Sequence, residues 1–233
     1  MAKLTNSAKQ VRGRKMLSVR VKNAKYNSVS SNRWLQRQLN DPYVAEAKRM
    51  GYRSRAAYKL IQLDEKFHFL GKGKTIVDLG CAPGGWTQIA ALRNKGSGQI
   101  IGMDLLPTQA IDGAVLLQQD FTEVGAAERI KSMLHGAADV VMSDMAANTT
   151  GVQNVDHLRT LALVEAAYAF AKEVLASGGI FIAKVFQGGT EGNLLADMKK
   201  HFAKVTHFKP DASRQDSVEM YVVAVGFKPA AEA

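Results

Sequence analysis

Four charged side chains stand in apolar surroundings along this sequence. Lys184 lies within AKVF, Glu219 within VEMY and Lys59 within YKLI, while Asp144 ends the apolar run VVMSD. Burying an ionised group is unfavourable unless it is paired or changes its protonation. We therefore expect these four side chains to form a charged cluster with a chemical role.

Two lysines and two carboxylates in one place suit the removal of a proton from a weakly acidic hydroxyl. A ribose hydroxyl ionises far above neutral pH, so a base that takes its proton during group transfer assists the reaction. A buried lysine crowded by a second ammonium group can act as that base. We assign the role to Lys184, with Lys59 favouring its neutral form or orienting the hydroxyl. Asp144 and Glu219 then hold the lysines by hydrogen bonds, and the alternative is a structural ion pair between Lys184 and Glu219.

A glycine-containing turn, LGCAPGGW, is a second candidate site. The residues expected near a ligand there are Gly80, Pro83, Gly84, Gly85 and Trp86. Glycines let the backbone turn tightly and approach a ligand closely. The dinucleotide fingerprint G-x-G-x-x-G is absent, and proline removes an N–H that a pyrophosphate would use. The turn thus argues against a nicotinamide dehydrogenase and favours a ligand without phosphate, such as S-adenosylmethionine.

Two further acids follow the next two apolar runs. Asp104 is placed to accept hydrogen bonds from both hydroxyls of a ribose, and Asp120 to accept one from an adenine amino group. The alternative for Asp120 is to cap a helix that starts near Thr122. Neither proline nor an aromatic residue follows Asp144 directly, as it often does in enzymes that methylate base amines. A base nitrogen is therefore disfavoured as the acceptor.

These side chains need a sheet whose strand ends meet. Apolar runs predict strands at 75–79, 99–103, 114–117, 139–143, 180–185, 204–208 and 220–227, and helical patterns occur near 84–94, 122–134, 155–175 and 191–201. Short apolar strands joined by helical crossovers predict a doubly wound, Rossmann-like α/β fold with helices on both faces. The last two strands are joined only by a turn-rich segment. We therefore expect a seven-stranded, mostly parallel sheet with an antiparallel pair at one edge and one antiparallel edge strand.

Three helices are predicted before the sheet, within residues 31–70. Ser31 is a candidate cap for the first, and Asp41, followed by proline, starts the second. Gly51 ends that helix, and Ser54 is a candidate cap for the third.

The excess of basic side chains is confined to the first 40 residues. Residues 1–40 contain ten basic side chains and no acid, which accounts for the whole formal net charge of +10. Residues 1–30 lack apolar periodicity and are predicted to be a flexible basic arm that contacts nucleic acid. A solvated tail and a mitochondrial transit peptide are the alternatives. Lys48, Arg49, Arg53 and Arg55 extend the hypothetical RNA track towards Lys59.

The bulk composition excludes several classes of protein. A chain of 233 residues suits one domain with an appendage, and no apolar run approaches the ~18 residues of a membrane span. The single cysteine, Cys81, cannot form an internal disulfide and fits a cytoplasmic location. The histidines show no metal-ligand spacing with it, so no metal is expected. Nothing in the sequence requires more than a monomer.

The combined motifs resemble the FtsJ/RrmJ family of RNA ribose 2′-O-methyltransferases. The segments that carry the resemblance are SSNRWLQRQLNDPYVAEAKRMGYRSRAAYKL, VDLGCAPGGW, GMDLLP, QQDF, SDMA, AKVFQG and VEMY. It implies a single S-adenosylmethionine-dependent methyltransferase domain over residues 31–229, with N-terminal helices at 31–70 and a Rossmann-like core at 74–227. The family's Lys-Asp-Lys-Glu tetrad falls on Lys59, Asp144, Lys184 and Glu219, and its cofactor contacts fall on Gly84, Trp86, Asp104, Asp120 and Asp144.

The resemblance also implies a substrate. SSNRWLQRQLNDPYV is similar to the bacterial members, which methylate a uridine of 23S rRNA in the 50S ribosomal subunit. Related eukaryotic enzymes act on tRNA or on mitochondrial rRNA. The sequence departs from the family at Cys81, where alanine is common, and at Ala147, where proline often stands. A catalytically silent module that binds S-adenosylmethionine and RNA is the alternative of another class, and the complete tetrad argues against it.

Overall fold

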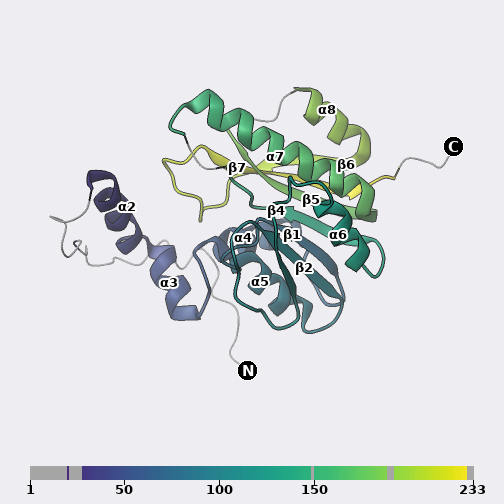
Figure 1. Ribbon diagram of the computed structural model, residues 1–233, viewed down its shortest axis with the longest axis horizontal. Coiled ribbons are helices and arrows are strands. Elements are labelled where there is room, and N and C mark those ends of the chain that lie inside the picture. The colour runs from purple at the N-terminus through teal and green to yellow at the C-terminus, as the bar shows by residue number, and fades with distance from the viewer. Residues whose placement is uncertain (1–19, 21–27, 148–149, 188–191, 230–233) are drawn as a thin grey trace.

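The computed structural model describes residues 20, 28–147, 150–187 and 192–229 (Figure 1). The predicted basic arm, residues 1–30, therefore lies outside the described residues except for 20 and 28–30.

Seven strands of the described chain form one sheet. They are β1 (Thr75–Leu79), β2 (Gln99–Asp104), β3 (Val115–Gln118), β4 (Ala138–Ser143), β5 (Leu175–Phe186), β6 (Phe202–Phe208) and β7 (Glu219–Phe227). Their order is β3-β2-β1-β4-β5-β7-β6, and only the pairs that β7 makes with β5 and β6 are antiparallel. The predicted antiparallel pair at one edge is confirmed. The antiparallel strand, β7, lies one position in from that edge because the chain turns back after β6 and inserts β7 beside β5.

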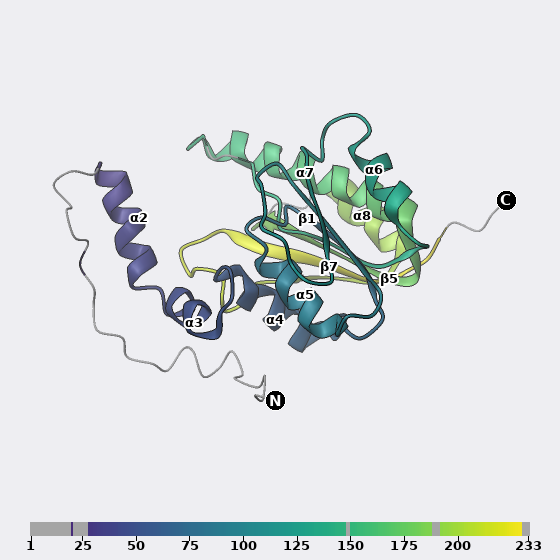
Figure 2. The ribbon, with the colours of Figure 1, turned by 60° about the horizontal axis from the view of Figure 1, so that its bottom comes forward.

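Helices cover both faces of the sheet, as predicted. They are α2 (Val29–Leu39), α3 (Pro42–Met50), α4 (Ala56–Phe67), α5 (Gly85–Asn94), α6 (Ala126–Met133), α7 (Gln153–Val174) and α8 (Gly192–His201). In Figure 2, α4 and α5 lie on one side of the sheet and α6, α7 and α8 on the other, while α2 and α3 project from the body. None of the helices in the described ranges is both long and apolar enough to cross a membrane.

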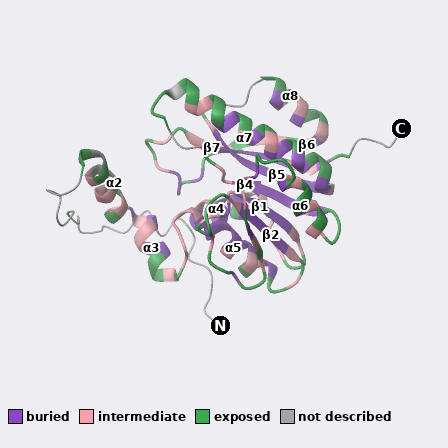
Figure 3. Ribbon diagram, viewed as in Figure 1, coloured by how far each residue is buried: buried purple, intermediate pink, exposed green. Residues whose placement is uncertain are grey.

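The core is split by the sheet into two apolar layers, and most strand residues are buried in Figure 3. Along β5, Phe181 and Ala183 pack in the layer under α6, α7 and α8, whereas Ile182 packs in the layer with α4 and α5. Successive side chains of a strand point to opposite faces. Lys184, two residues after Ile182, therefore points towards α4 rather than α7.

Two of the predicted helix caps differ from those observed. Ser28, not Ser31, caps α2, because the Ser28 hydroxyl accepts the backbone N–H of Ser31 and the helix starts at Val29. Helix α4 has no side-chain cap, and among the described residues the buried Ser54 Oγ has no hydrogen-bond partner. The predicted start of α3 at Asp41 and its end at Gly51 are confirmed.

Helix α6 starts later than the predicted residue 122. The Asp120 carboxylate accepts the backbone N–H and the hydroxyl of Thr122 at 2.8 and 2.7 Å, and these bonds stabilise a turn in place of a helical start. Gly125 then precedes the helix in a left-handed conformation.

Candidate active site

The loops that follow β1 and β4 meet at the carboxyl ends of the strands. The Asp144 N–H donates to the Leu79 carbonyl at 3.0 Å. Gly80 has a φ of 78°, and a Cβ atom there would lie 2.7 Å from the backbone nitrogen of Met145. Glycine is therefore required at position 80, because any side chain would clash with the second loop.

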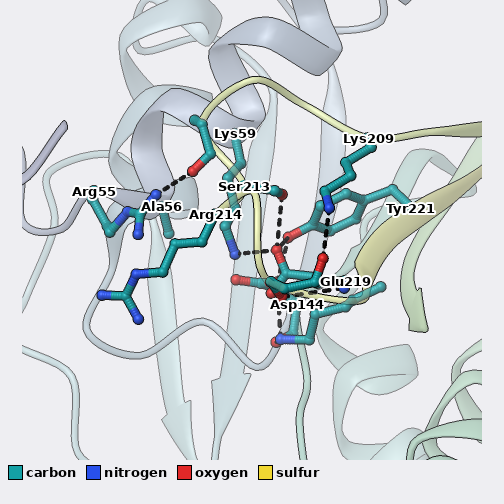
Figure 4. Close-up of polar contacts among 12 residues, drawn as sticks. Arg55, Ala56, Lys59, Asp144, Lys209, Ser213, Arg214, Glu219 and Tyr221 are labelled. Atoms are coloured by element: carbon teal, nitrogen blue, oxygen red, sulfur yellow. Dashed lines mark hydrogen bonds and ion pairs between the residues drawn. The ribbon is translucent and has the colours of Figure 1, made fainter. Parts of the chain in front are cut away.

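Lys184 and Asp144 form one half of the charged cluster, and Figure 4 shows Asp144 close to Glu219 and Tyr221. The Lys184 Nζ atom lies 2.7 Å from the Asp144 carbonyl oxygen and 3.1 Å from its Oδ1 atom. Only 7% of Lys184 is exposed. Burial in the α4 layer is thus compensated by two acceptors on a single residue.

Lys59 and Glu219 form the second half. Lys59 projects from α4, and its Nζ atom lies 2.6 Å from Oε1 of Glu219 at the start of β7. Ser213 donates to the same oxygen at 3.0 Å. The structure thus pairs Glu219 with Lys59, and Lys184 with Asp144, in place of a Lys184–Glu219 ion pair.

Tyr221 joins the two halves. It lies opposite Lys184 in the β5–β7 ladder, and its hydroxyl donates to Asp144 Oδ1 at 2.8 Å and lies 3.4 Å from Glu219 Oε1. Burial and the two carboxylates raise the pKa of Tyr221 well above its ordinary value, so the hydroxyl stays a neutral donor. Sequence analysis missed this residue, although its spacing from Glu219 puts both on one face of a strand.

The charge of Asp144 is fixed by its neighbours. Burial raises the pKa of this carboxyl, but the ammonium groups of Lys184 and Lys59 and the Tyr221 hydroxyl together outweigh it, and the pKa of Asp144 is lowered. Asp144 is therefore an ionised acceptor at neutral pH.

A cavity of about 370 Å³ adjoins this cluster. Its lining includes Gly80, Met103, Asp104, Leu105, Asp120, Phe121, Met145, Ala146, Ala147 and Arg159. The Asp104 carboxylate is held by the backbone N–H groups of Ala82 and Leu106, both at 2.8 Å. Hydrogen bonds from Thr122 lower the pKa of Asp120, so this carboxyl also stays ionised.

The other residues of the predicted turn make different contacts. In the described ranges, Pro83, Gly84, Gly85 and Trp86 are not part of the cavity lining. Gly84 precedes α5 in a left-handed conformation. The Trp86 indole is buried, donates to the Ala56 carbonyl at 2.9 Å and packs 5.4 Å from the ring of Tyr221. Trp86 thus packs against Tyr221 and helps to fix the position of its ring in the charged cluster.

Asp78, the fourth of the five residues of β1, was also missed by sequence analysis. It is fully buried, accepts a 2.6 Å hydrogen bond from Thr87, and has no partner for Oδ1 among the described residues. Burial is the main cause that raises its pKa to about 7. A charge within an apolar run, the signal that identified Lys184, could also have identified Asp78.

A second, basic cavity of about 450 Å³ opens beside Lys59 and Glu219. It is lined by Arg37, Gln38, Arg55, Ala56, Lys59, Arg214, Asp216, Ser217 and Glu219. Arg55 donates to the Ala212 carbonyl and pairs with Asp41 at 2.6 Å. Lys59 and Glu219 of the charged cluster therefore line the basic cavity. Asp144 lies directly before Met145, Ala146 and Ala147, which line the 370 Å³ cavity.

Three of the four residues of the hypothetical RNA track, Lys48, Arg49, Arg53 and Arg55, make different contacts in the structure. Arg55 lines the basic cavity, whereas Arg49 forms a hydrogen-bonded ion pair with Glu46. Arg53 donates to the carbonyl of Pro83 in the turn after β1 and to the carbonyls of Gln109 and Ala110 between β2 and β3.

Comparison with known proteins places this geometry in context. A family model described as FtsJ-like methyltransferase matches residues 52–227. Two relatives, both named Ribosomal RNA large subunit methyltransferase E, come from Azorhizobium caulinodans and Paramagnetospirillum magneticum. The first is 60% identical over 219 residues, 93% of this chain and 91% of the relative. The second is 59% identical over 225 residues, 94% of this chain and 92% of the relative.

Solved structures give the same picture of the fold. A Plasmodium falciparum protein provisionally named a ribosomal RNA methyltransferase superposes with a TM-score of 0.68 at 33% identity, over 76% of this chain and 98% of that one. The fibrillarin/Nop5p complex contains a chain that superposes with a TM-score of 0.53 at 16% identity, over 75% and 85% of the two chains. This second likeness bears on the fold alone.

Proposed function

The chain belongs to the FtsJ-like methyltransferase family, and from that premise we propose that it transfers a methyl group from S-adenosylmethionine to the 2′-hydroxyl of a uridine in 23S rRNA, within the 50S ribosomal subunit. The observation that carries the proposal is the buried pairing of Lys184 with Asp144 between two cavities of different character. The names of the relatives support a large-subunit rRNA substrate. The uridine and the 2′-hydroxyl rest on the family resemblance and on the lysine chemistry.

The cavity with Asp104 and Asp120 fits S-adenosylmethionine. Its volume of about 370 Å³ is typical of a small-molecule site, and Met103 and Phe121 give it an apolar wall. Each Asp104 oxygen accepts one backbone N–H and keeps capacity for a ribose hydroxyl, while Asp120 remains available to an adenine amino group. When bound, S-adenosylmethionine would supply a methyl group on a positively charged sulfur: an oxygen nucleophile would bond to the methyl carbon as the carbon–sulfur bond breaks, and S-adenosylhomocysteine would leave.

Lys184 takes the proton of the ribose hydroxyl after it has lost its own proton to solvent, because the ammonium form that pairs with Asp144 has no lone pair. A neutral amine has two N–H donors and one lone pair, and the two Asp144 acceptors match the two donors. The lone pair is then left for the hydroxyl proton, which moves to Lys184 as the new C–O bond forms. Base assistance of this kind is worth about 10²–10⁴-fold in rate.

The remaining charged residues orient the acceptor. Lys59, held by Glu219, presents its ammonium group at the edge of the basic cavity and donates to the ribose oxygen. Arg55 and Arg214 line the same cavity and bind RNA phosphates, which fix position without reading sequence.

The proposal extends to the organisation of the chain. Residues 31–229 act as one methyltransferase domain, and the basic arm at 1–30 adds salt-dependent contacts to rRNA. The protein acts as a monomer in the cytoplasm, where ribosomal subunits are found.

Methyl transfer to defined RNA tests the proposal. Large ribosomal subunits that lack their own 2′-O-methyl marks are incubated with the protein and labelled S-adenosylmethionine, and the RNA is digested to nucleosides. We expect label in 2′-O-methyluridine from 23S rRNA. Label in tRNA alone would change the substrate, and label on a base would contradict the chemistry. Tight cofactor binding without label on any RNA would favour the silent binding module.

A further inference from the structure

The connection between β2 and β3 is an irregular loop at the cofactor cavity. Residues 105–114 contain neither helix nor strand, and Ile111 is the one buried residue among them. Leu105 nevertheless lines the cavity directly after Asp104. A loop with so little buried surface needs polar contacts to hold one conformation.

Arg53 supplies such contacts from the segment before α4. Its Nη1 atom donates to the Gln109 carbonyl at 2.7 Å and to the Pro83 carbonyl at 3.4 Å, and its Nη2 atom donates to the Ala110 carbonyl at 2.6 Å. One guanidinium group thus bridges loop 105–114 and the turn after β1. The planar, multi-donor geometry of arginine suits this bridge, and a lysine ammonium group cannot reproduce it.

The backbone of Arg53 is itself fixed on α5. Its N–H donates to Gln88 Oε1 at 3.0 Å, and Gln88 Nε2 donates to the Gly51 carbonyl at 2.9 Å. A Cβ atom at Gly84 would lie 2.8 Å from Ile111 Cδ1 and 2.9 Å from Arg53 Cδ. The turn, the loop and the arginine therefore meet in close contact at Gly84.

The same two segments hold the Asp104 carboxylate. One of its oxygens accepts the N–H of Ala82 from the turn, and the other accepts the N–H of Leu106 from the loop. The Ala82 bond ties the turn to the end of β2, and the Leu106 bond ties the start of the loop to the same carboxylate. Arg53 contacts the turn at Pro83, next to Ala82, and contacts the loop further along, at Gln109 and Ala110.

We propose that Arg53 is a positioning residue for the cofactor site: it fastens loop 105–114 to the turn after β1 and so holds Asp104 and Leu105 at the cavity. The proposal rests on the assignment of that cavity to S-adenosylmethionine. It separates Arg53 from Arg55, two residues further on, which lines the basic cavity.

The test compares Arg53→Ala and Arg53→Lys with Arg55→Ala in the full chain. Calorimetry gives the Kd for S-adenosylmethionine without RNA, and hydrogen exchange reports on amides 105–114 in the free protein. For Arg53→Ala we expect a Kd raised about tenfold, corresponding to the loss of one net hydrogen bond to a charged group. Amide exchange in the loop should be faster, and Arg53→Lys should recover only part of either effect. The KM for the cofactor should rise in step with the Kd, with kcat within about twofold of native.

Arg55→Ala provides the opposite expectation, with weaker RNA binding and an unchanged Kd for the cofactor. Native cofactor affinity in Arg53→Ala, native loop exchange, or a loss of RNA affinity equal to that of Arg55→Ala would overturn the proposal. If Arg53→Ala does not fold, the same comparison is made with Arg53→Lys, which keeps the charge. A native protein that does not bind S-adenosylmethionine would contradict the proposed function, and loop exchange would still test the fastening.

Discussion

The charged cluster and the cofactor cavity adjoin at Asp144 and Met145 but are built by different means. The cluster consists of side chains from α4, β5 and β7 and the loop after β4, and their charges are paired with one another. The cavity is shaped by backbone turns, with carboxylates held by backbone N–H groups. Because the side chains of the cluster depend on one another, a single substitution there should greatly lower kcat. Because the cavity is shaped largely by the backbone, a single substitution there should weaken ligand affinity only moderately.

Apart from substitution of Lys184, the largest effect in this comparison is expected from Lys59→Met. It removes the ammonium group paired with Glu219 at the basic cavity, and kcat should fall by about 100-fold. The Kd for S-adenosylmethionine should stay within about twofold. Lys66→Met is the matched control because Lys66 lies seven residues along the same helix and its ammonium group lies over the Phe208 ring. Equal losses in the two variants would show that the effect is not specific to the site.

A smaller loss is expected from Tyr221→Phe. The change keeps the ring against Trp86 and removes the hydrogen bond to Asp144. Loss of a bond to a charged group should lower kcat about tenfold, with the cofactor KM unchanged. Steady-state kinetics on 50S subunits measures both constants. A variant as active as the native protein would show that the Tyr221 hydroxyl has no role in the reaction.

On the cofactor side, Asp104→Asn should show the opposite kinetic pattern. The amide keeps one acceptor oxygen, but its NH₂ group faces a backbone N–H and a ligand hydroxyl with the wrong polarity. We expect the cofactor KM and Kd to rise three- to tenfold, at about 1 kcal/mol per lost bond, with kcat little changed. A kcat defect at saturating cofactor would contradict the division between the two regions.

The smallest effect on methyl transfer is expected from Asp78→Asn, which should instead alter the pH dependence of stability. Burial raises the pKa of Asp78 to about 7, above its unfolded value. The contribution of its protonated form to stability is therefore fully present below about pH 4 and is lost as the pH rises through about 7. The variant has no such proton to lose, so the difference in Tm between variant and native should grow between about pH 4 and 7. Asp112→Asn, in the exposed loop, is the control, and identical pH profiles for native and Asp78→Asn would contradict the assignment.

Sequence analysis predicted the parts of the molecule that depend on local pattern. The apolar runs predicted the strands, and the charged residues within those runs identified Lys184 and Glu219 as candidates. The partners of these charges depend on strand order: β5 lies between β4 and β7, so Asp144 and Glu219 approach from opposite sides. The separation of Lys184 and Asp144 in the sequence therefore could not predict that they form an ion pair.

Arg53 and Arg55 show the same limit at closer range. Both stand in one basic segment, and composition assigns both to RNA. In the structure, Arg53 reaches the carbonyls of the cofactor-side loop while Arg55 reaches the basic cavity. The direction of a side chain just before a helix depends on the tertiary contacts of Gln88 and Asp41, which no local pattern encodes.

The most direct test of the central claim is methyl transfer by Lys184→Met, measured on unmethylated 50S subunits together with the Kd for S-adenosylmethionine. Lys172→Met is the control, since Lys172 forms a partly exposed ion pair with Asp197 between α7 and α8. If Lys184 is the base, its variant should transfer methyl groups about 10²–10⁴-fold more slowly, with cofactor affinity within about twofold of native. Transfer at a near-native rate by Lys184→Met would contradict the account.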